Sequence, residues 1–234
     1  MVDLIDTTEM YLRTILELEE EGVPPLRARI SERLNHSGPT VSQTVGRMER
    51  DGLVVVTPER RLELTIEGRE KAIHVMRKHR LAERLLSDVI GLEWEFVHEE
   101  ACRWEHVMSE HVERKLLKML GYPTESPYGN PIPGLAELGI ETTQSAAQSR
   151  SSTKILSVTK LLEDNKTATA TVRRLAEPAQ VDPEMLVSLA EAGVVPGNTV
   201  KFEVDGEYVR AQAEGAEAAI EMHQDFATFI FVEA

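Results

Sequence analysis

The stretch SGPTVSQTVGRMERDGLVVVTPERRLELT, residues 37–65, decides the fold of the first part of the chain. Proline is favoured in the first turn of a helix and glycine just past its end, so a helix is predicted from Pro39 to about Asp51. The β-rich runs at 53–56 and 62–65 enclose a five-residue polar turn. Such a pair of runs predicts a hairpin, so the stretch is expected to form a helix followed directly by a β-hairpin.

Two further helices are predicted upstream of this stretch. Asp6 and Glu9 form a capping pair, and an apolar stripe follows until Gly22 ends the first helix. The stripe consists of Tyr11, Leu12, Ile15, Leu16 and Leu18. A short second helix covers 26–34. Helix, helix, turn, helix and hairpin is the organisation of a winged helix-turn-helix.

Helical patterns continue downstream and then give way to β-type patterns. The predicted helices cover 67–90, 93–108 and 110–120. A stretch rich in Thr, Ser, Gln and Ala at 141–152 is typical of a linker. The remaining β-type runs, interrupted by a helix at 183–192, predict a small β-barrel. These runs are 155–161, 168–175, 199–204, 208–211 and 228–232. The fold class is therefore mostly α with a C-terminal β domain.

The composition is that of an ordinary globular protein with an acidic surface. Its 234 residues hold 26 Lys and Arg against 40 Asp and Glu, a formal net charge of −14. The single cysteine excludes an intramolecular disulfide framework and fits a reducing cytosol. The first ten residues lack the features of a secretory signal, and no apolar run could span a bilayer, so we expect a cytoplasmic protein. Taken alone, the acidity argues against a nucleic-acid partner.

Local charge reverses that argument. The window 26–61 holds seven Arg against four acidic residues, a local charge of +3, and the helix predicted from Pro39 opens with short polar side chains. Guanidinium, hydroxyl and amide groups are what phosphates and base edges require. Half of the net charge, −7 from 8 basic and 15 acidic residues, belongs to 141–234. We therefore favour DNA binding over a solvated helix without a specific partner.

Six potential metal ligands lie within 28 positions of the predicted helices. They are His79, Glu83, His98, Cys102, Glu105 and His106. The four-residue spacing that recurs among them places side chains on one helical face. A mixture of thiol, imidazole and carboxylate donors suits a mid-to-late first-row divalent ion better than Mg²⁺ or Ca²⁺. A surface ion pair and a cysteine that acts as a small hydrophobe are the alternatives. The number of such residues favours a metal site, although the spacing is not that of a zinc finger.

Met10 is a further candidate ligand. At 100° per residue, it lies about 150° from the centre of the apolar stripe of its own helix. Most helical methionines fill cores, but this position is expected to face away from the core. A thioether ligand is therefore plausible at Met10.

The residues described so far carry a resemblance to a known family. The chain closely resembles the diphtheria toxin repressor family of iron-dependent transcriptional regulators, over most of 1–140. The matching blocks are DTTEMYLRTI (6–15), LEEEGVPPLRARI (18–30), SGPTVSQTV (37–45), RMERDGLVVV (47–56), MRKHRLAERLL (76–86), EACRWEHVMS (100–109) and GNPIPGLAELG (129–139). The resemblance implies a winged helix-turn-helix at 1–73, a dimerisation and metal-binding domain at 74–140, a linker at 141–150 and an SH3-like domain at 151–234.

The resemblance also implies two metal sites and an anion site. The primary metal site would comprise Met10, Cys102, Glu105 and His106. An ancillary site would comprise His79, Glu83 and His98, completed by a Glu and a Gln of the C-terminal domain, for which the best matches are Glu177 and Gln180. The anion would lie on Arg80, Ser126 and Asn130. The implied ion is Fe²⁺, two per subunit, with Co²⁺, Ni²⁺, Mn²⁺ or Zn²⁺ able to substitute in vitro.

The implied function is metal-activated repression of iron uptake and storage genes, by a homodimer on palindromic operators. Gln43 would lie nearest the bases. The other implied DNA contacts are Thr7, Arg27, Ala28, Ser37, Pro39, Thr40, Ser42, Arg47, Arg50 and Arg60. For His74, His111 and His223 we expect no role beyond exposed structural positions.

Two alternatives remain open. A manganese-responsive regulator of the same family is the nearer one, but Cys102 and Met10 disfavour it because Mn²⁺ prefers hard oxygen ligands. A metal-dependent hydrolase is the other, since a His, Glu and Cys site could activate water. No H-E-x-x-H motif, nucleophile elbow or phosphate loop supports it.

Overall fold

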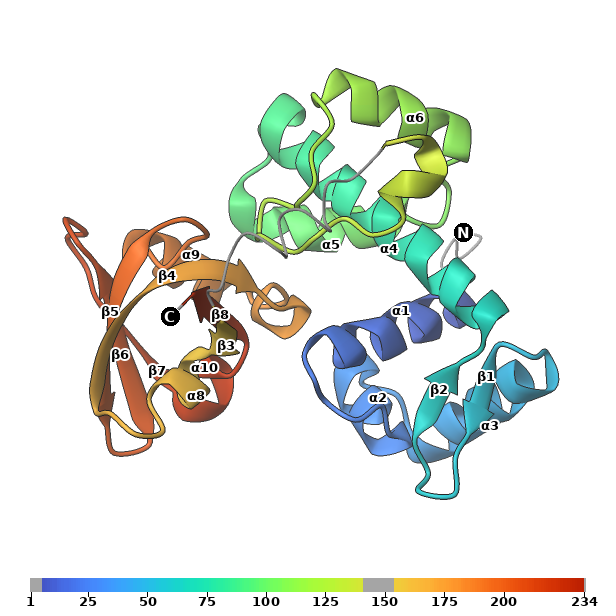
Figure 1. The fold of residues 1–234 in the computed structure, drawn as a ribbon, viewed down its shortest axis with the longest axis horizontal. Coiled ribbons are helices and arrows are strands. Elements are labelled where there is room, and N and C mark those ends of the chain that lie inside the picture. Colours follow the sequence, from blue (N-terminus) through green and yellow to red (C-terminus); the bar gives the residue numbers. More distant parts are fainter. Residues whose placement is uncertain (1–5, 141–153, 234) are drawn as a thin grey trace.

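The computed structural model describes residues 6–140 and 154–233, and the predicted linker at 141–150 lies outside the described residues. The described chain forms a winged unit, a helical unit and a β unit, which confirms the expected fold class (Figure 1). Among the described residues, no helix has the length and apolarity needed to cross a membrane.

The winged unit is built as the sequence predicts. It comprises α1 (Thr7–Glu20), α2 (Arg27–Leu34), α3 (Gly38–Arg50), β1 (Val54–Val56) and β2 (Leu62–Leu64). The Asp6 side chain caps α1 by accepting from the backbone N–H of Thr8 and Glu9, and Ser37 caps α3 through the N–H of Thr40. β1 and β2 pair antiparallel as the wing. The predicted apolar stripe of α1 is buried.

The helical unit contains one helix that ends earlier than predicted. Its elements are α4 (Ile66–Leu85), the π-helix η1 (Leu86–Ile90), α5 (Trp94–Trp104), α6 (Glu110–Met119) and the 3₁₀ helix η2 (Leu135–Leu138). The helix predicted over 93–108 stops at Trp104 because Ser109 caps the next helix, so the chain must turn between them. Glu105 and His106 therefore lie in a turn and not on a continuous helical face.

The β unit is an antiparallel sheet with the strand order β3-β8-β4-β5-β6-β7. Its strands are β3 (Ile155–Ser157), β4 (Thr167–Leu175), β5 (Thr199–Asp205), β6 (Tyr208–Ala213), β7 (Ile220–His223) and β8 (Ile230–Glu233). Its helices are α8 (Val158–Leu161), η3 (Glu177–Ala179), α9 (Pro183–Glu191) and α10 (Gln224–Ala227). The strand predicted over 155–161 was wrong beyond Ser157, whose side chain caps α8. Neither β7 nor α10 was predicted from the sequence.

The helical unit packs against both the winged unit and the β unit. Helix α1 packs on α4, the long helix that joins the winged and helical units (Figure 1). The apolar core of the β unit is continuous with residues of α4 and α5, including Ala82 and Val97. A β-bulge in β4, between Val172 and Arg174, changes the direction of the side chains at the end of that strand. The Arg174 guanidinium donates to the backbone oxygen of Glu20, so the β unit also contacts the end of α1.

Candidate metal centre and nucleic-acid interface

A buried group of carboxylates and imidazoles joins the helical unit to the β unit. His79 and Glu83 lie one turn apart on α4, and His79 Nε2 is 2.9 Å from Glu83 Oε1. His98 of α5 brings its Nδ1 to 3.2 Å from Oε2 of Glu177, a residue of η3. One ligand atom from each of the four residues lies within 4.8 Å of all the others. We call these four residues the preformed cluster.

The preformed cluster fits a metal ion because its own atoms leave ligand positions unsatisfied. Glu83 Oε2, His98 Nδ1 and Glu177 Oε2 are buried without a properly oriented hydrogen-bond partner among the described residues. Gln180 is likewise buried, and its Oε1 has no such partner, while its Nε2 donates to Leu175 O at 2.8 Å. Buried polar atoms without partners are costly in a protein, and a cation would satisfy them together.

Local structure explains why Glu177 and Gln180 reach this position. Pro178 falls in the first turn of the 3₁₀ helix η3, where proline is tolerated. The turn follows the bulged end of β4 and directs both side chains inward, so that Glu177 is 5% exposed and Gln180 1%. The structure thus places both residues predicted from the C-terminal part of the chain at the interface with α4 and α5.

Electrostatics keep the carboxylates of this cluster charged. Burial tends to raise the pKa of Glu177, but the adjacent His98 imidazole and the charge of His79 hold it well below its ordinary value. Burial likewise tends to lower the pKa of His79, yet the Glu83 carboxylate raises it well above the usual range. A metal ion at these residues must therefore displace protons from the imidazoles.

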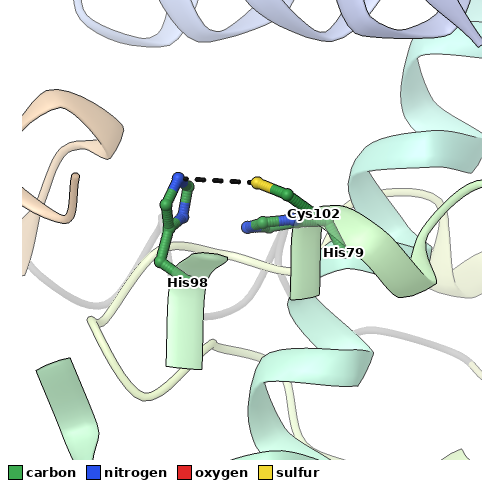
Figure 2. Close-up of side chains that lie close together, drawn as sticks. All are labelled: His79, His98 and Cys102. Carbon is green, nitrogen blue, oxygen red and sulfur yellow. Dashed lines mark hydrogen bonds between the residues drawn. The ribbon is translucent and has the colours of Figure 1, made fainter. Parts of the chain in front are cut away.

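The ligands predicted for the primary site are less well assembled. Cys102 Sγ lies 3.7 Å from His98 Nε2, and Figure 2 shows the thiol, His98 and His79 pointing toward one another. Glu105 Oε1 is 3.3 Å from His106 Nε2. Among the described residues, the groups of three or more ligands within 4.8 Å do not include Glu105 or His106. The structure therefore separates Cys102 from the other two.

Each remaining ligand of the primary set has a partner within the protein. His106 Nδ1 is hydrogen-bonded to Glu9 Oε2 of α1 at 2.7 Å. Glu105 Oε2 lies 2.7 Å from His79 Nδ1, so the His79 ring contacts both candidate sites through its two nitrogens. Met10 is half-buried and packs against the core of the winged unit. The expectation that Met10 faces away from this core was wrong, because core residues from α4 extend the apolar surface around α1.

Arg13, which sequence reasoning missed, lies among these ligands. Its guanidinium Nη1 donates to Glu105 Oε2 at 2.5 Å and to Cys102 Sγ at 3.4 Å. Burial tends to raise the pKa of Cys102, but the positive charges of Arg13 and His98 hold it well below its ordinary value. A charged residue within the predicted α1 stripe, between Leu12 and Ile15, was the available signal.

The predicted anion ligands are all engaged by protein groups. Arg80 is fully buried and donates to both carboxylate oxygens of Glu20, at 3.0 and 2.6 Å. Asn130 Nδ2 donates to a backbone oxygen of β4, and Ser126 Oγ accepts from the N–H of Tyr128 at 3.2 Å. The Glu20 carboxylate thus binds the Arg80 guanidinium, to which a free anion was predicted to bind. The anion site itself stays a prediction.

The residues predicted to contact DNA lie at the starts of α1 and α2, along α3 and in the wing. Most are exposed: Ala28, Ser37, Pro39, Thr40, Ser42, Gln43, Arg47, Arg50 and Arg60. Thr7 and Arg27 are half-buried. Arg60 lies in the turn between β1 and β2 and has a positive φ of 65°. The histidines without an expected role, His74, His111 and His223, are exposed.

Comparisons with known proteins agree with this geometry. Residues 3–62 match the iron dependent repressor N-terminal DNA binding domain, 65–134 the iron dependent repressor metal binding and dimerisation domain, and 158–234 the diphtheria toxin repressor SH3 domain. The chain is 62% identical to the iron-dependent repressor IdeR of Mycobacterium leprae, over 87% of this chain and 86% of that protein. It is 54% identical to the diphtheria toxin repressor of Corynebacterium glutamicum, over 100% and 98%.

Solved structures extend the comparison to other metals. The IdeR of T. acidophilum is 30% identical, with a TM-score of 0.74 over 98% of both chains. A manganese-dependent transcriptional repressor in complex with manganese is 25% identical, with a TM-score of 0.78 over 97% of this chain and 100% of that one. Similar folds therefore occur in repressors named for different metals.

Proposed function

This chain belongs to the diphtheria toxin repressor family of iron-dependent repressors, and from that membership we propose that Fe²⁺ is its physiological activating ion. It is a metal-dependent transcriptional repressor and not an enzyme. The observation that carries the proposal is the preformed cluster, in which Glu83 Oε2, His98 Nδ1 and Glu177 Oε2 are buried without a properly oriented hydrogen-bond partner among the described residues. A divalent cation is the ligand that such a donor set selects.

We assign two ions to each subunit. The ancillary ion binds the preformed cluster together with Gln180. The primary ion binds Met10, Cys102, Glu105 and His106, where Arg13 holds Glu105 Oε2 before the ion binds, whereas His106 can coordinate through Nε2 while its Nδ1 keeps the hydrogen bond to Glu9. Because Met10 belongs to α1, the primary ion fixes the winged unit relative to the helical unit. Only a difference in affinity between two conformations can drive such a switch.

Iron is favoured over manganese by the donor atoms. The thiolate of Cys102 and the thioether of Met10 are soft ligands, whereas Mn²⁺ prefers carboxylates and other oxygen donors. Relatives at 50–62% identity are named as iron-dependent or diphtheria toxin repressors, and the manganese-dependent repressor is 25% identical. Manganese remains the second candidate.

The repressor acts as a homodimer on a palindromic operator. Several large apolar side chains of the helical unit are about half exposed, as expected of a surface that a second copy covers: Val89, Ile90, Phe96 and Val107. Two copies related by a two-fold axis present two α3 helices to successive major grooves. The exposed Arg side chains contact phosphates and Gln43 contacts a base. The protein acts in the cytoplasm.

One experiment tests the metal switch. A duplex is selected from a random pool with Co²⁺-loaded protein, and its retardation is then measured anaerobically with Fe²⁺, Mn²⁺ or chelator. We expect tight binding with Fe²⁺, weaker binding with Mn²⁺, none in chelator, and a two-fold symmetric selected sequence. Cys102→Ala is expected to abolish DNA binding in the presence of metal. The matched variant Cys102→Asp is expected to bind DNA better with Mn²⁺ than with Fe²⁺. Equal binding in chelator would refute the switch.

A further inference from the structure

Arg13 is a buried cation in direct contact with residues assigned to the primary site. It lies on α1, is 7% exposed, and extends its guanidinium between α1 and α5. Nη1 donates to Glu105 Oε2 at 2.5 Å and to Cys102 Sγ at 3.4 Å. The same nitrogen is 2.9 Å from His79 Nδ1. One guanidinium thus contacts two assigned ligands and the ring that links the two sites.

The guanidinium occupies one of the two Glu105 carboxylate oxygens, Oε2, and one side of the Cys102 sulfur. A carboxylate oxygen or a thiolate that accepts a short, charge-assisted hydrogen bond cannot at the same time coordinate a cation along that direction. A divalent ion on Glu105 and Cys102 would also lie a few ångströms from the positive charge of Arg13, in a buried environment where repulsion is weakly screened. Arg13 and a metal ion therefore compete at these two ligands.

We propose that Arg13 is a built-in cation that neutralises Glu105 and Cys102 when no metal is bound, and that a divalent ion must displace it. The proposal rests on the primary site assigned above. It adds a residue that is not a ligand and yet determines the metal affinity of the primary site. Arg13 acts through the ligands and is a positioning residue.

The structure provides a place for the displaced side chain. Arg13 Nε is 2.8 Å from Glu17 Oε1, one turn further along α1, so the guanidinium keeps an ion-pair partner when it leaves Glu105. Burial raises the pKa of Glu17 to about 7, since the positive charges of Arg13 and Arg33 only partly compensate the loss of solvent. If the Arg13 guanidinium moved fully onto Glu17, its charge would stabilise the buried Glu17 carboxylate more strongly. Displacement by metal therefore removes the contact of Arg13 with Glu105 but leaves Arg13 paired with Glu17.

Displacement of Arg13 also acts on α1. Arg13 and Met10 are three residues apart and lie on neighbouring positions of one helical face. A metal ion attracts the Met10 thioether and repels the Arg13 guanidinium, so both contacts that α1 makes to the primary site depend on metal. Because α1 carries Tyr11, Leu12 and Ile15 of the winged core, a change in these contacts acts on the unit that holds α3. Arg13 thereby links metal binding to the winged unit.

The test compares metal affinity in charge-removing and charge-keeping variants. Co²⁺ is titrated into the full-length protein, and the thiolate-to-Co²⁺ charge-transfer absorption reports the primary site independently of DNA binding. We expect Arg13→Gln to raise Co²⁺ affinity at least tenfold and to lower the Tm in chelator. Arg13→Lys keeps the charge and is expected to stay within about threefold of the wild type, since the Coulomb repulsion between the side chain and the ion depends on that charge.

Arg77→Gln is the matched control. Arg77 is also a buried arginine that pairs with glutamates, Glu113 and Glu137, and it contacts neither an assigned ligand nor Glu17. We expect this variant to lower the Tm in chelator without changing Co²⁺ affinity. Unchanged or lower affinity in Arg13→Gln would overturn the proposal, as would a tenfold rise in Arg13→Lys, which also decides the matter if Arg13→Gln does not fold. If the wild type showed no Cys102-dependent charge-transfer absorption with Co²⁺, the assignment of the primary site itself would be wrong.

Discussion

The preformed cluster and the primary set share the helix α5 but differ in how complete they are. In the preformed cluster, His79, Glu83, His98 and Glu177 converge within 4.8 Å, and several of their atoms lack hydrogen-bond partners in the described chain. In the primary set, Glu105 is held by Arg13 and His106 by Glu9. The ligands of the first site are already gathered and must only exchange protons for an ion, whereas Glu105 of the second site must also exchange Arg13 for an ion.

This difference assigns different tasks to the two ions. An ion in the preformed cluster mainly stabilises the packing of the β unit on the helical unit, because the ligands already have their positions. On the proposed ligand assignment, an ion in the primary set would bind Met10 of α1, so its binding energy would be coupled to the position of α1. We therefore propose that the primary set is the switch and that the preformed cluster is a structural clasp that supports it.

The largest expected effect is a difference in DNA affinity between a variant of the primary set and a variant of the preformed cluster. His106→Ala removes a ligand of the switch and is expected to weaken Co²⁺-dependent DNA binding about 100-fold, close to 2.7 kcal/mol. Glu177→Ala removes a ligand of the clasp and is expected to weaken it only about tenfold, since α1 can still be fixed. DNA retardation at a saturating Co²⁺ concentration measures both. The reverse order of the two variants would assign the switch to the preformed cluster.

The second prediction concerns thermal stability. An ion at 100 times its Kd adds about 2.7 kcal/mol to a folded protein, or ~5–10 °C in the Tm of a chain of this size. We expect most of this gain to come from the preformed cluster. Glu83→Gln, which keeps the shape of the buried side chain, should therefore lose most of the Co²⁺-induced rise in Tm, measured by calorimetry. Cys102→Ala serves as the comparison and should retain it.

A smaller effect tests whether the β unit supports only the clasp. Arg174 donates to Glu20 O at 2.9 Å, and its guanidinium lies 3.8 Å from the centroid of the Phe231 ring. Arg174→Met keeps apolar contact with the ring and removes the hydrogen bonds to Glu20 O and Asn130 Oδ1, at a cost of roughly 1–2 kcal/mol. We expect a slightly lower Tm and weaker Co²⁺ binding at the clasp, with the thiolate absorption unchanged. Equal weakening of both sites would show that the β unit also positions the switch.

Much of the fold followed from the sequence because its signals are local. The caps at Asp6 and Ser37 and the apolar stripe of α1 depend on neighbouring residues, and the structure confirms them. The end of α5 at Trp104 and the strand β7 were missed. Both depend on how distant segments pack: β7 completes the sheet beside β6, and α5 must end where the chain turns toward α6.

The candidate sites divide in the same way. The spacing of His79 and Glu83 on one helix was visible in the sequence, and so were the residue types of a metal site. Glu177 could be selected only through the family resemblance, because it comes from a distant unit. Arg13 was missed since its contacts to α4 and α5 join residues 66 to 92 positions apart. Neither helical periodicity nor composition reports such contacts.

The smallest expected effect concerns the pH dependence of the switch without metal. Burial tends to lower the pKa of His106, but its hydrogen bond to Glu9 and the charge of Glu105 raise it above 6.5. A raised pKa means that the pair stabilises the fold fully below pH 6.5 and that this stability is lost as pH rises through the folded-state pKa. Since Glu9 is about one-third exposed, the contribution is below about 1 kcal/mol.

Glu9→Gln tests this pair. In chelator, the variant should lower the Tm more at about pH 6 than at about pH 8, and NMR titration should show a lower pKa for the His106 imidazole than in the wild type. The exposed pair of His74 and Glu137 offers a matched control, because Glu137→Gln leaves the His106 titration unaffected. An unchanged pKa of His106 in Glu9→Gln would show that the hydrogen bond to Glu9 does not hold the imidazole. Glu9 would then not orient the Nε2 atom that His106 offers to a metal ion.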